Sequence, residues 1–95
     1  MGVKADEQES RAVDQKQAHS HSSNHREEIL ISKICGCFYC RQTFEPGAIT
    51  EWIDEVDGVF QTALCPKCGI DSVIGSASGF PITSDFLASM HRAWF

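Results

Sequence analysis

A small α+β domain is the fold class that three features of the sequence predict. Four of the five cysteines in the 95-residue chain form two CxxC pairs, and a domain of this size often needs such a staple. The segment between the pairs alternates apolar and polar residues and contains an Asp-Gly turn, as a β-hairpin does. The C-terminal residues place apolar side chains at helical spacing. A chain of this length corresponds to one domain.

The N-terminal residues 1–23 are predicted to be a disordered polar tail that precedes an ordered domain over residues 24–95. The tail has no apolar period, so it cannot bury enough surface to offset the entropy of ordering. The histidines of the segment QAHSHSSNH, namely His19, His21 and His25, could bind a metal weakly, but a solvated Ser/His linker is the favoured interpretation. The opening residues lack the apolar run of a signal peptide, so we expect a cytoplasmic protein with reduced thiols.

A short helix is predicted over residues 24–34. Ser23 or Asn24 can cap its start, and the glutamate three residues after Asn24 completes a capping box. Gly36 is typical of the residue that ends a helix. The isoleucine-rich sequence makes a strand over residues 29–35 the alternative.

A β-hairpin is predicted between the two CxxC pairs. Residues 49–53 alternate as a strand does, and residues 54–58 form a loop with the strong turn dipeptide Asp-Gly. Residues 59–64 return as the second strand and lead directly into Cys65. A third strand is possible within residues 70–75.

A C-terminal helix is predicted to begin after Thr83, whose hydroxyl can cap it. Phe86, Leu87, Met90 and Trp94 then fall on one helical face. We expect this face to pack on the core, although an aromatic stripe could also receive a partner.

The two CxxC pairs predict a metal site formed by Cys37, Cys40, Cys65 and Cys68. A CxxC turn lets two sulfurs point at one ion, and a hairpin brings two such turns together. Four thiolates in a tetrahedron favour Zn²⁺, with iron as the main competitor. Gly69 follows the second pair and permits the positive φ that frees backbone N–H groups toward sulfur. The expected architecture is a zinc ribbon flanked by the two helices.

Cys35 offers an alternative, because Cys35 and Cys37 form a CxC motif. Cys37 and Cys40 are favoured as ligands, since only they reproduce the two-residue spacing of the second pair. Cys35 is then predicted to be a buried free thiol at the end of the helix. A treble clef, with a helix that starts at the second pair, is the alternative fold; Gly69 and the β-branched residues that follow disfavour it.

A structural rather than catalytic metal follows from four cysteine ligands, because a catalytic zinc normally keeps one exchangeable position. His91 has no evident acidic partner and is predicted to face solvent, so we expect no enzymatic activity. Binding of zinc to finger peptides contributes roughly 10–16 kcal/mol to their folding. The favoured function is a non-catalytic module that binds another protein.

Two other functions remain as alternatives. In a thiol-based redox switch, the second pair, Cys65 and Cys68, would form a disulfide under oxidant and release zinc. Nucleic-acid binding is disfavoured by the net charge of −5 and the scattered basic residues. No membrane partner is expected, because no apolar run approaches the roughly 18 residues of a membrane span.

Several stretches, namely NHREEI, CGCFYC, EWID, QTALCPKCGIDSVIG, FPIT and MHRAWF, give the chain a family resemblance over residues 18–95. On these stretches it resembles a family of small, uncharacterised bacterial proteins that are described as cytoplasmic proteins. The resemblance implies that Cys37, Cys40, Cys65 and Cys68 are the metal positions, and it implies no activity.

Overall fold

The computed structural model of the chain describes residues 16–95. It has a small α+β fold with a helical turn at residues 16–20, two further α-helices, five short strands and two 3-10 turns. In chain order these elements are α2 (Arg26–Ile31), β1 (Cys35–Cys37), β2 (Thr43–Phe44), the 3-10 turn Pro46–Ala48, β3 (Trp52–Val56), β4 (Val59–Ala63), β5 (Val73–Gly75), the 3-10 turn Ser76–Ser78 and α3 (Ser84–Trp94).

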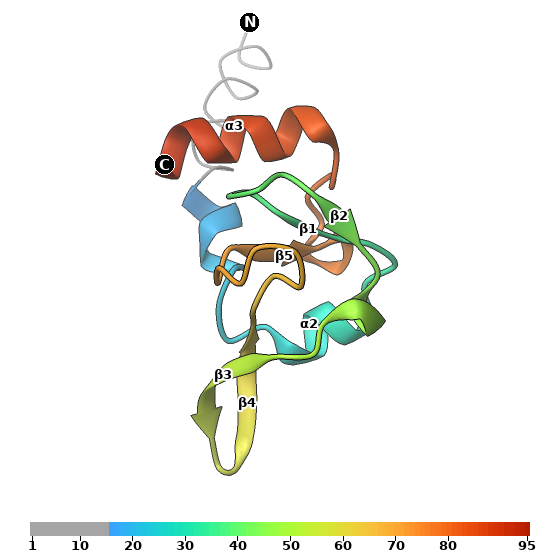
Figure 1. The fold of residues 1–95 in the computed structure, drawn as a ribbon, viewed down its shortest axis with the longest axis vertical. Helices are drawn as coiled ribbons and strands as arrows, with labels where there is room; N and C mark the ends of the chain where they lie inside the picture. The colour runs from blue at the N-terminus through green and yellow to red at the C-terminus, as the bar shows by residue number, and fades with distance from the viewer. Residues whose placement is uncertain (1–15) are drawn as a thin grey trace, which may run out of the picture.

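The strands form two separate antiparallel sheets (Figure 1). β1 is the central strand of a three-stranded sheet with the order β2-β1-β5, while β3 and β4 form a hairpin of their own. The predicted third strand is therefore present as β5, where Val73 pairs with Cys37 and Gly75 pairs with Cys35. This pairing places the start of the first CxxC turn against the residues that follow the second.

The hairpin is confirmed, and its turn has the predicted chemistry. Asp57 and Gly58 both have positive φ angles, of 52° and 82°, as a two-residue turn requires when it matches the twist of its strands. The first strand runs from Trp52 to Val56 rather than over residues 49–53, so the loop predicted over residues 54–58 is wrong and only Asp57 and Gly58 connect the strands. Ile49 instead follows the Pro46–Ala48 turn and is buried in the core around the cysteines.

The helix predicted over residues 24–34 is shorter than expected. His25 is its N-cap and makes no side-chain capping bond, while Asn24 has a φ of 49°. The predicted capping box is therefore wrong. The cause is a tertiary contact, because the N–H of His25 donates to the Gln61 carbonyl of β4 at 2.9 Å. The alternative strand over residues 29–35 is right only at its end, where β1 begins.

Gly36 does not end a helix; it lies in the middle of β1. A Cβ atom at this position would lie 2.9 Å from both Ile82 Cγ2 and Leu87 Cδ1. Glycine is required here because α3 and the segment before it pack directly on the strand. The glycine at position 36 therefore marks the close approach of β1 and α3 and not the end of a helix.

The C-terminal helix α3 begins and packs as predicted. The Thr83 hydroxyl accepts a hydrogen bond from the Phe86 N–H at 3.1 Å, which caps the helix. Leu87 and Met90 are fully buried against the three-stranded sheet. Trp94 is not a core residue, because 40% of its surface is exposed. The centre of its ring lies 4.1 Å from the centre of the His19 ring.

Residues 16–23 are packed on the domain, although they fall within the segment predicted to be a disordered tail. Ala18 is fully buried with Leu87 and Met90, and Ser22 is also buried. A single small residue inserted into the core leaves no periodic pattern, so the sequence gives no sign of this contact. The predicted boundary at residue 24 is thus too late, and the rest of the predicted tail, residues 1–15, lies outside the described residues.

Among residues 16–95, no helix combines the length and the apolar character that a membrane crossing requires.

Candidate metal centre

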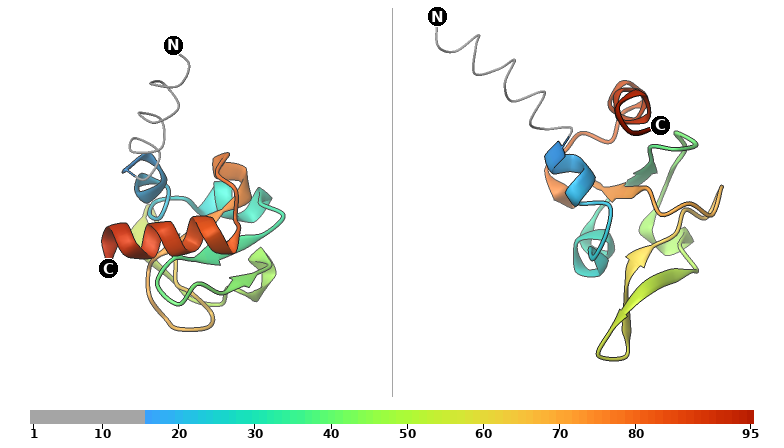
Figure 2. Two further views of the ribbon diagram at one scale, coloured as in Figure 1. Left: turned by 90° about the horizontal axis from the view of Figure 1, so that it is seen from above. Right: turned by 90° about the vertical axis from the view of Figure 1, so that its left-hand side faces the viewer.

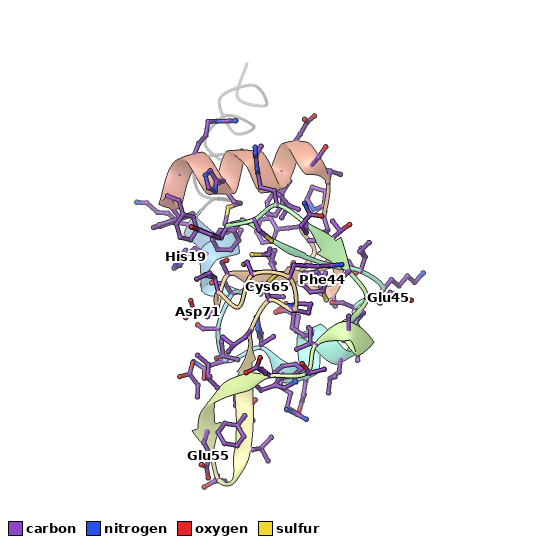
Figure 3. The ribbon with its side chains drawn as sticks, viewed as in Figure 1. His19, Phe44, Glu45, Glu55, Cys65 and Asp71 are labelled. Atoms are coloured by element: carbon purple, nitrogen blue, oxygen red, sulfur yellow. The ribbon has the colours of Figure 1, made fainter. Side chains whose placement is uncertain are left out.

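Two CxxC turns meet between the sheets and bring four thiols together. The first turn runs from the end of β1, and the second follows β4. Figure 3 shows Cys65 of the second turn in the middle of the molecule, between α3 and the hairpin. The Sγ atoms of the group lie within 4.8 Å of one another. Its members are the four predicted ligands: Cys37, Cys40, Cys65 and Cys68.

The distances between the sulfurs fit a tetrahedral metal ion. Cys37 Sγ lies 3.6 Å from Cys68 Sγ, and Cys40 Sγ lies 3.7 Å from Cys65 Sγ. Zinc–sulfur bonds of about 2.3 Å in a tetrahedron place the sulfurs roughly 3.8 Å apart. All four cysteines are free thiols. The group could therefore hold one metal ion.

An equivalent backbone hydrogen bond closes each of the two turns. In each turn, the N–H of the first cysteine donates to a carbonyl five residues later. These bonds join Cys37 to Gln42 at 3.0 Å and Cys65 to Ile70 at 2.9 Å. The two turns are thus structural equivalents, and each can present two sulfurs to one ion.

The residue after each turn adopts the left-handed conformation. Arg41 has a φ of 63° and Gly69 a φ of 82°, and their N–H groups donate to the carbonyls of Cys37 and Cys65 at 2.7 and 2.8 Å. The positive φ predicted for Gly69 is confirmed. At Arg41 the same conformation costs about 1–2 kcal/mol, because its Cβ crowds the following carbonyl. This cost indicates that the turn geometry is strongly determined by its surroundings.

Hydrogen bonds to sulfur favour thiolates. The Lys67 N–H donates to Cys65 Sγ at 3.3 Å, and the Ser72 hydroxyl lies 3.1 Å from Cys37 Sγ. Burial alone would raise the pKa of Cys37, but hydrogen bonds from Ser72 and from two backbone N–H groups of the turn outweigh it and lower the pKa. Metal ligation requires the thiolate form. Ser72 is the site residue that sequence reasoning missed, because only the fold brings it to Cys37.

Cys40 and Cys68 need a cation close by to ionise. Burial, with smaller contributions from the neighbouring thiols, raises the pKa of Cys40 and raises that of Cys68 to about 12. A bound metal ion would instead lower the pKa values of these thiols, since coordination deprotonates a thiol outright. Metal binding at this site is therefore expected to release protons.

Cys35 stands apart from the four sulfurs. It is fully buried in β1, and burial raises the pKa of its thiol to about 11. It packs with Ile29 and Phe44 in the apolar core. The structure thus places Cys35 as a buried free thiol, in a strand rather than at the end of a helix.

The histidines do not form a second cluster among the described residues, where the four thiols are the one group that could hold a metal ion. His19 contacts the Trp94 ring, His21 pairs with Glu28 at 2.8 Å, and His25 is buried against β4. His91 does not simply face solvent as predicted. Its Nδ1 lies 3.1 Å from the Phe38 carbonyl, so this histidine ties α3 to the first CxxC turn.

Comparison with protein-family models finds no family that matches the chain. Comparisons with curated proteins and with solved structures find no match either. The functional conclusion therefore depends on the chemistry of the site itself.

Proposed function

We propose that the chain is a cytoplasmic zinc ribbon whose four-cysteine zinc site is structural and whose role is to bind another protein. The observation that carries the proposal is the set of sulfur–sulfur distances, 3.6 and 3.7 Å across the two turns. Four thiolates at this separation fill the coordination sphere of zinc and leave no position for water or substrate. The ion then contributes folding free energy and takes no part in a reaction.

The position of the site supports a structural role. The first turn begins in the three-stranded sheet, and the second turn continues from the hairpin. A metal ion between them joins the two sheets, which share no strand pairing. Cys37 and Cys65 are buried in the core, so the ion would also complete that core.

The connection between the cysteines supports the ribbon architecture over the treble clef. The hairpin leads into Cys65, and the chain after Cys68 proceeds to β5 rather than to a helix. The next helix, α3, begins at Ser84, well beyond the second turn.

Native mass spectrometry of freshly purified protein tests the metal. We expect one zinc per chain. Removal of the zinc with a chelator should abolish the folded circular-dichroism signal, because the apo chain loses the ion that joins the two sheets. Iron in the site, or a chain that stays folded without metal, would contradict the proposal of a structural zinc.

A thiol-based redox switch is the second candidate, and the exposure of two ligands favours it. Cys40 and Cys68 are only partly buried, and each lies within 3.7 Å of a buried thiol of the other turn. A stoichiometric peroxide treatment separates the two functions. Retained zinc supports the structural role, whereas zinc loss with a mass decrease of two hydrogens per disulfide supports the switch.

A further inference from the structure

The hairpin of β3 and β4 projects from the body of the domain. Figure 1 and the right-hand view of Figure 2 show it at the end of the molecule opposite α3. A two-stranded sheet without further support is marginal in water. The proposed zinc site follows β4 directly, at the base of the hairpin, and would stabilise it there.

One edge of the hairpin is covered by the chain itself. The Gln61 carbonyl accepts from the His25 N–H at 2.9 Å, and the Ala63 N–H donates to His25 Nε2 at 3.1 Å. The Phe60 carbonyl accepts from Arg26 Nη1 at 2.9 Å. These backbone groups of β4 therefore point away from β3. The start of α2 and the residue before it occupy the outer edge of β4.

The other edge, along β3, is open. Trp52 pairs with Ala63, and Glu55 pairs with Phe60. The Ala63 N–H and the Phe60 carbonyl point outward on β4. The two residues of each pair therefore exchange no backbone hydrogen bonds with each other. Trp52 and Glu55 then also direct their backbone N–H and C=O groups outward. Within residues 16–95, β4 is the one strand that pairs with β3, and no backbone hydrogen bond from outside the hairpin reaches Trp52 or Glu55.

The open edge is short. Between Trp52 and Glu55, Asp54 has a φ of 62°, which interrupts the regular edge of the strand. Irregularities of this kind limit the pairing of an edge strand. Any strand added along β3 is therefore a short one.

Exposed apolar side chains from both strands lie at the tip of the hairpin, next to the end of this edge. Val56, Val59 and Phe60 lie at the tip of the hairpin with 52%, 44% and 46% of their surfaces exposed. Single exposed apolar residues are ordinary, but neighbouring ones at a projecting tip offer apolar surface that a partner can cover.

The negative charge of the hairpin favours some partners at the β3 edge over others. Its acids are Glu51, Asp54, Glu55 and Asp57, and no Lys or Arg occurs between residues 42 and 66. A second copy of the chain paired along β3 would place like charges together, which is unfavourable across strands. Nucleic acid and anionic membranes are repelled in the same way. A basic segment is attracted, and the acids guide its approach.

The chain already contains one contact of this kind. The Arg26 guanidinium lies 4.7 Å from the centre of the Trp52 ring, and its Nη1 donates to the Phe60 carbonyl. Such an arrangement combines a cation–π contact with a charge-assisted hydrogen bond. It shows that a basic side chain is well accommodated against the hairpin.

We infer that the open edge of β3 binds a short, extended segment of a partner protein that carries Lys or Arg alternating with aliphatic residues. The segment adds as a third strand, so that main-chain hydrogen bonds give affinity while the acids and the apolar tip give specificity. This inference rests on the proposed protein-binding role and names the surface and the chemistry of its partner.

The test uses the zinc-loaded full chain and a blocked hexapeptide of alternating Lys and Val as the probe. In ¹⁵N NMR titrations we expect shift changes concentrated at residues 51–60, with an affinity that falls as salt is added. The double change Glu51→Lys and Glu55→Lys should weaken binding about tenfold or more by removing the electrostatic attraction. The matched control, Glu45→Lys with Asp71→Lys, alters the net charge equally at exposed positions away from β3 and should bind almost as wild type does.

Two modified probes test the strand addition itself and leave the protein unchanged. The outward groups of Trp52 and Glu55 lie three residues apart on β3, so the peptide bonds to them through both Val and Lys residues. One hexapeptide is therefore N-methylated on the backbone of all six residues, and the control is methylated only on its three Lys side-chain amines, which keeps the positive charges and the backbone N–H groups. We expect backbone methylation to abolish binding, because it removes the N–H groups that would bond to β3, and side-chain methylation to weaken binding much less.

Several outcomes would overturn the inference. They are an absence of shift changes at β3, equal weakening in both charge variants, an equal effect of backbone and side-chain methylation, and dimerisation of the chain through this edge. Zinc content and circular dichroism measured on the same samples report the proposed structural zinc independently, so the two proposals can fail separately.

Discussion

The Ser72 hydroxyl lies 3.1 Å from Cys37 Sγ, and both residues are buried. The contact joins the two halves of the thiol site, because Cys37 ends β1 and Ser72 comes directly before β5. The Phe38 N–H also donates to the Ser72 carbonyl at 3.0 Å. Ser72 therefore orients the first CxxC turn through both its side chain and its backbone.

Ser72→Ala should weaken zinc binding. Loss of the hydroxyl removes the hydrogen bond that favours the Cys37 thiolate, and outer contacts of this kind typically change metal affinity by about 10–100-fold. Competition with a chromophoric chelator measures the effect. Ser78→Ala is the matched control, because Ser78 bonds only to nearby backbone groups away from the cysteines. Equal affinity in the two variants would show that Ser72 has no influence on the metal.

Local sequence signals predict the parts of this fold that local chemistry determines. The Asp57-Gly58 turn, the Thr83 cap and the spacing of the two CxxC pairs each depend on residues that are close in the chain. The structure places the turn, the cap and the four thiols as these signals indicate.

The parts that the sequence does not reveal depend on distant contacts. The start of α2 is set by the bond from His25 to Gln61, which lies in a remote part of the chain. Ser72 reaches Cys37 only because β5 pairs with β1. Ala18 gives no periodic signal for its burial. Propensity and spacing contain no information about such contacts. The start of α2, the contact of Ser72 with Cys37 and the extent of the ordered chain could therefore not be predicted.

Substitution of single cysteines should distinguish the metal ligands from the buried thiol of Cys35. Cys65→Ser removes a ligand, so we expect loss of stoichiometric zinc and of the folded state. Cys35→Ala should retain one zinc per chain, because Cys35 lies outside the group of four sulfurs, and should cost only about 1–2 kcal/mol for the small cavity. Elemental analysis and thermal unfolding measure both outcomes. Loss of zinc in Cys35→Ala would restore the CxC alternative for the first pair.

Gly36→Ala should destabilise the domain by about 1–3 kcal/mol, because the new methyl group overpacks the contact between β1 and α3. Gly47→Ala is the control, since a Cβ at Gly47 meets no atom within 4 Å. Denaturant unfolding of the zinc-saturated proteins gives the difference. Similar stability of both variants would mean that α3 can move away from β1 at little cost.

Acidification should destabilise the domain through His25. Burial lowers the pKa of His25 below its ordinary value of 6.5, and this effect outweighs the His21 carbonyl and Glu28, which raise it. The neutral ring accepts the Ala63 N–H at Nε2, and protonation would break that bond. Since the pKa is lower in the folded state, the unfolded chain binds the proton first, and stability falls as pH drops below about 6.5 toward the folded value.

Unfolding measured between about pH 8 and pH 5.5 with saturating zinc tests this dependence on His25. Acid also weakens zinc binding, so the comparison needs a variant that shares the metal site. His25→Gln keeps a donor and an acceptor but does not titrate. We expect its stability to be lower than that of wild type at pH 8 and to decline less steeply below about pH 6.5. Parallel slopes for the two proteins would assign the acid sensitivity to groups other than His25, and would mean that His25 titrates alike in the folded and the unfolded chain.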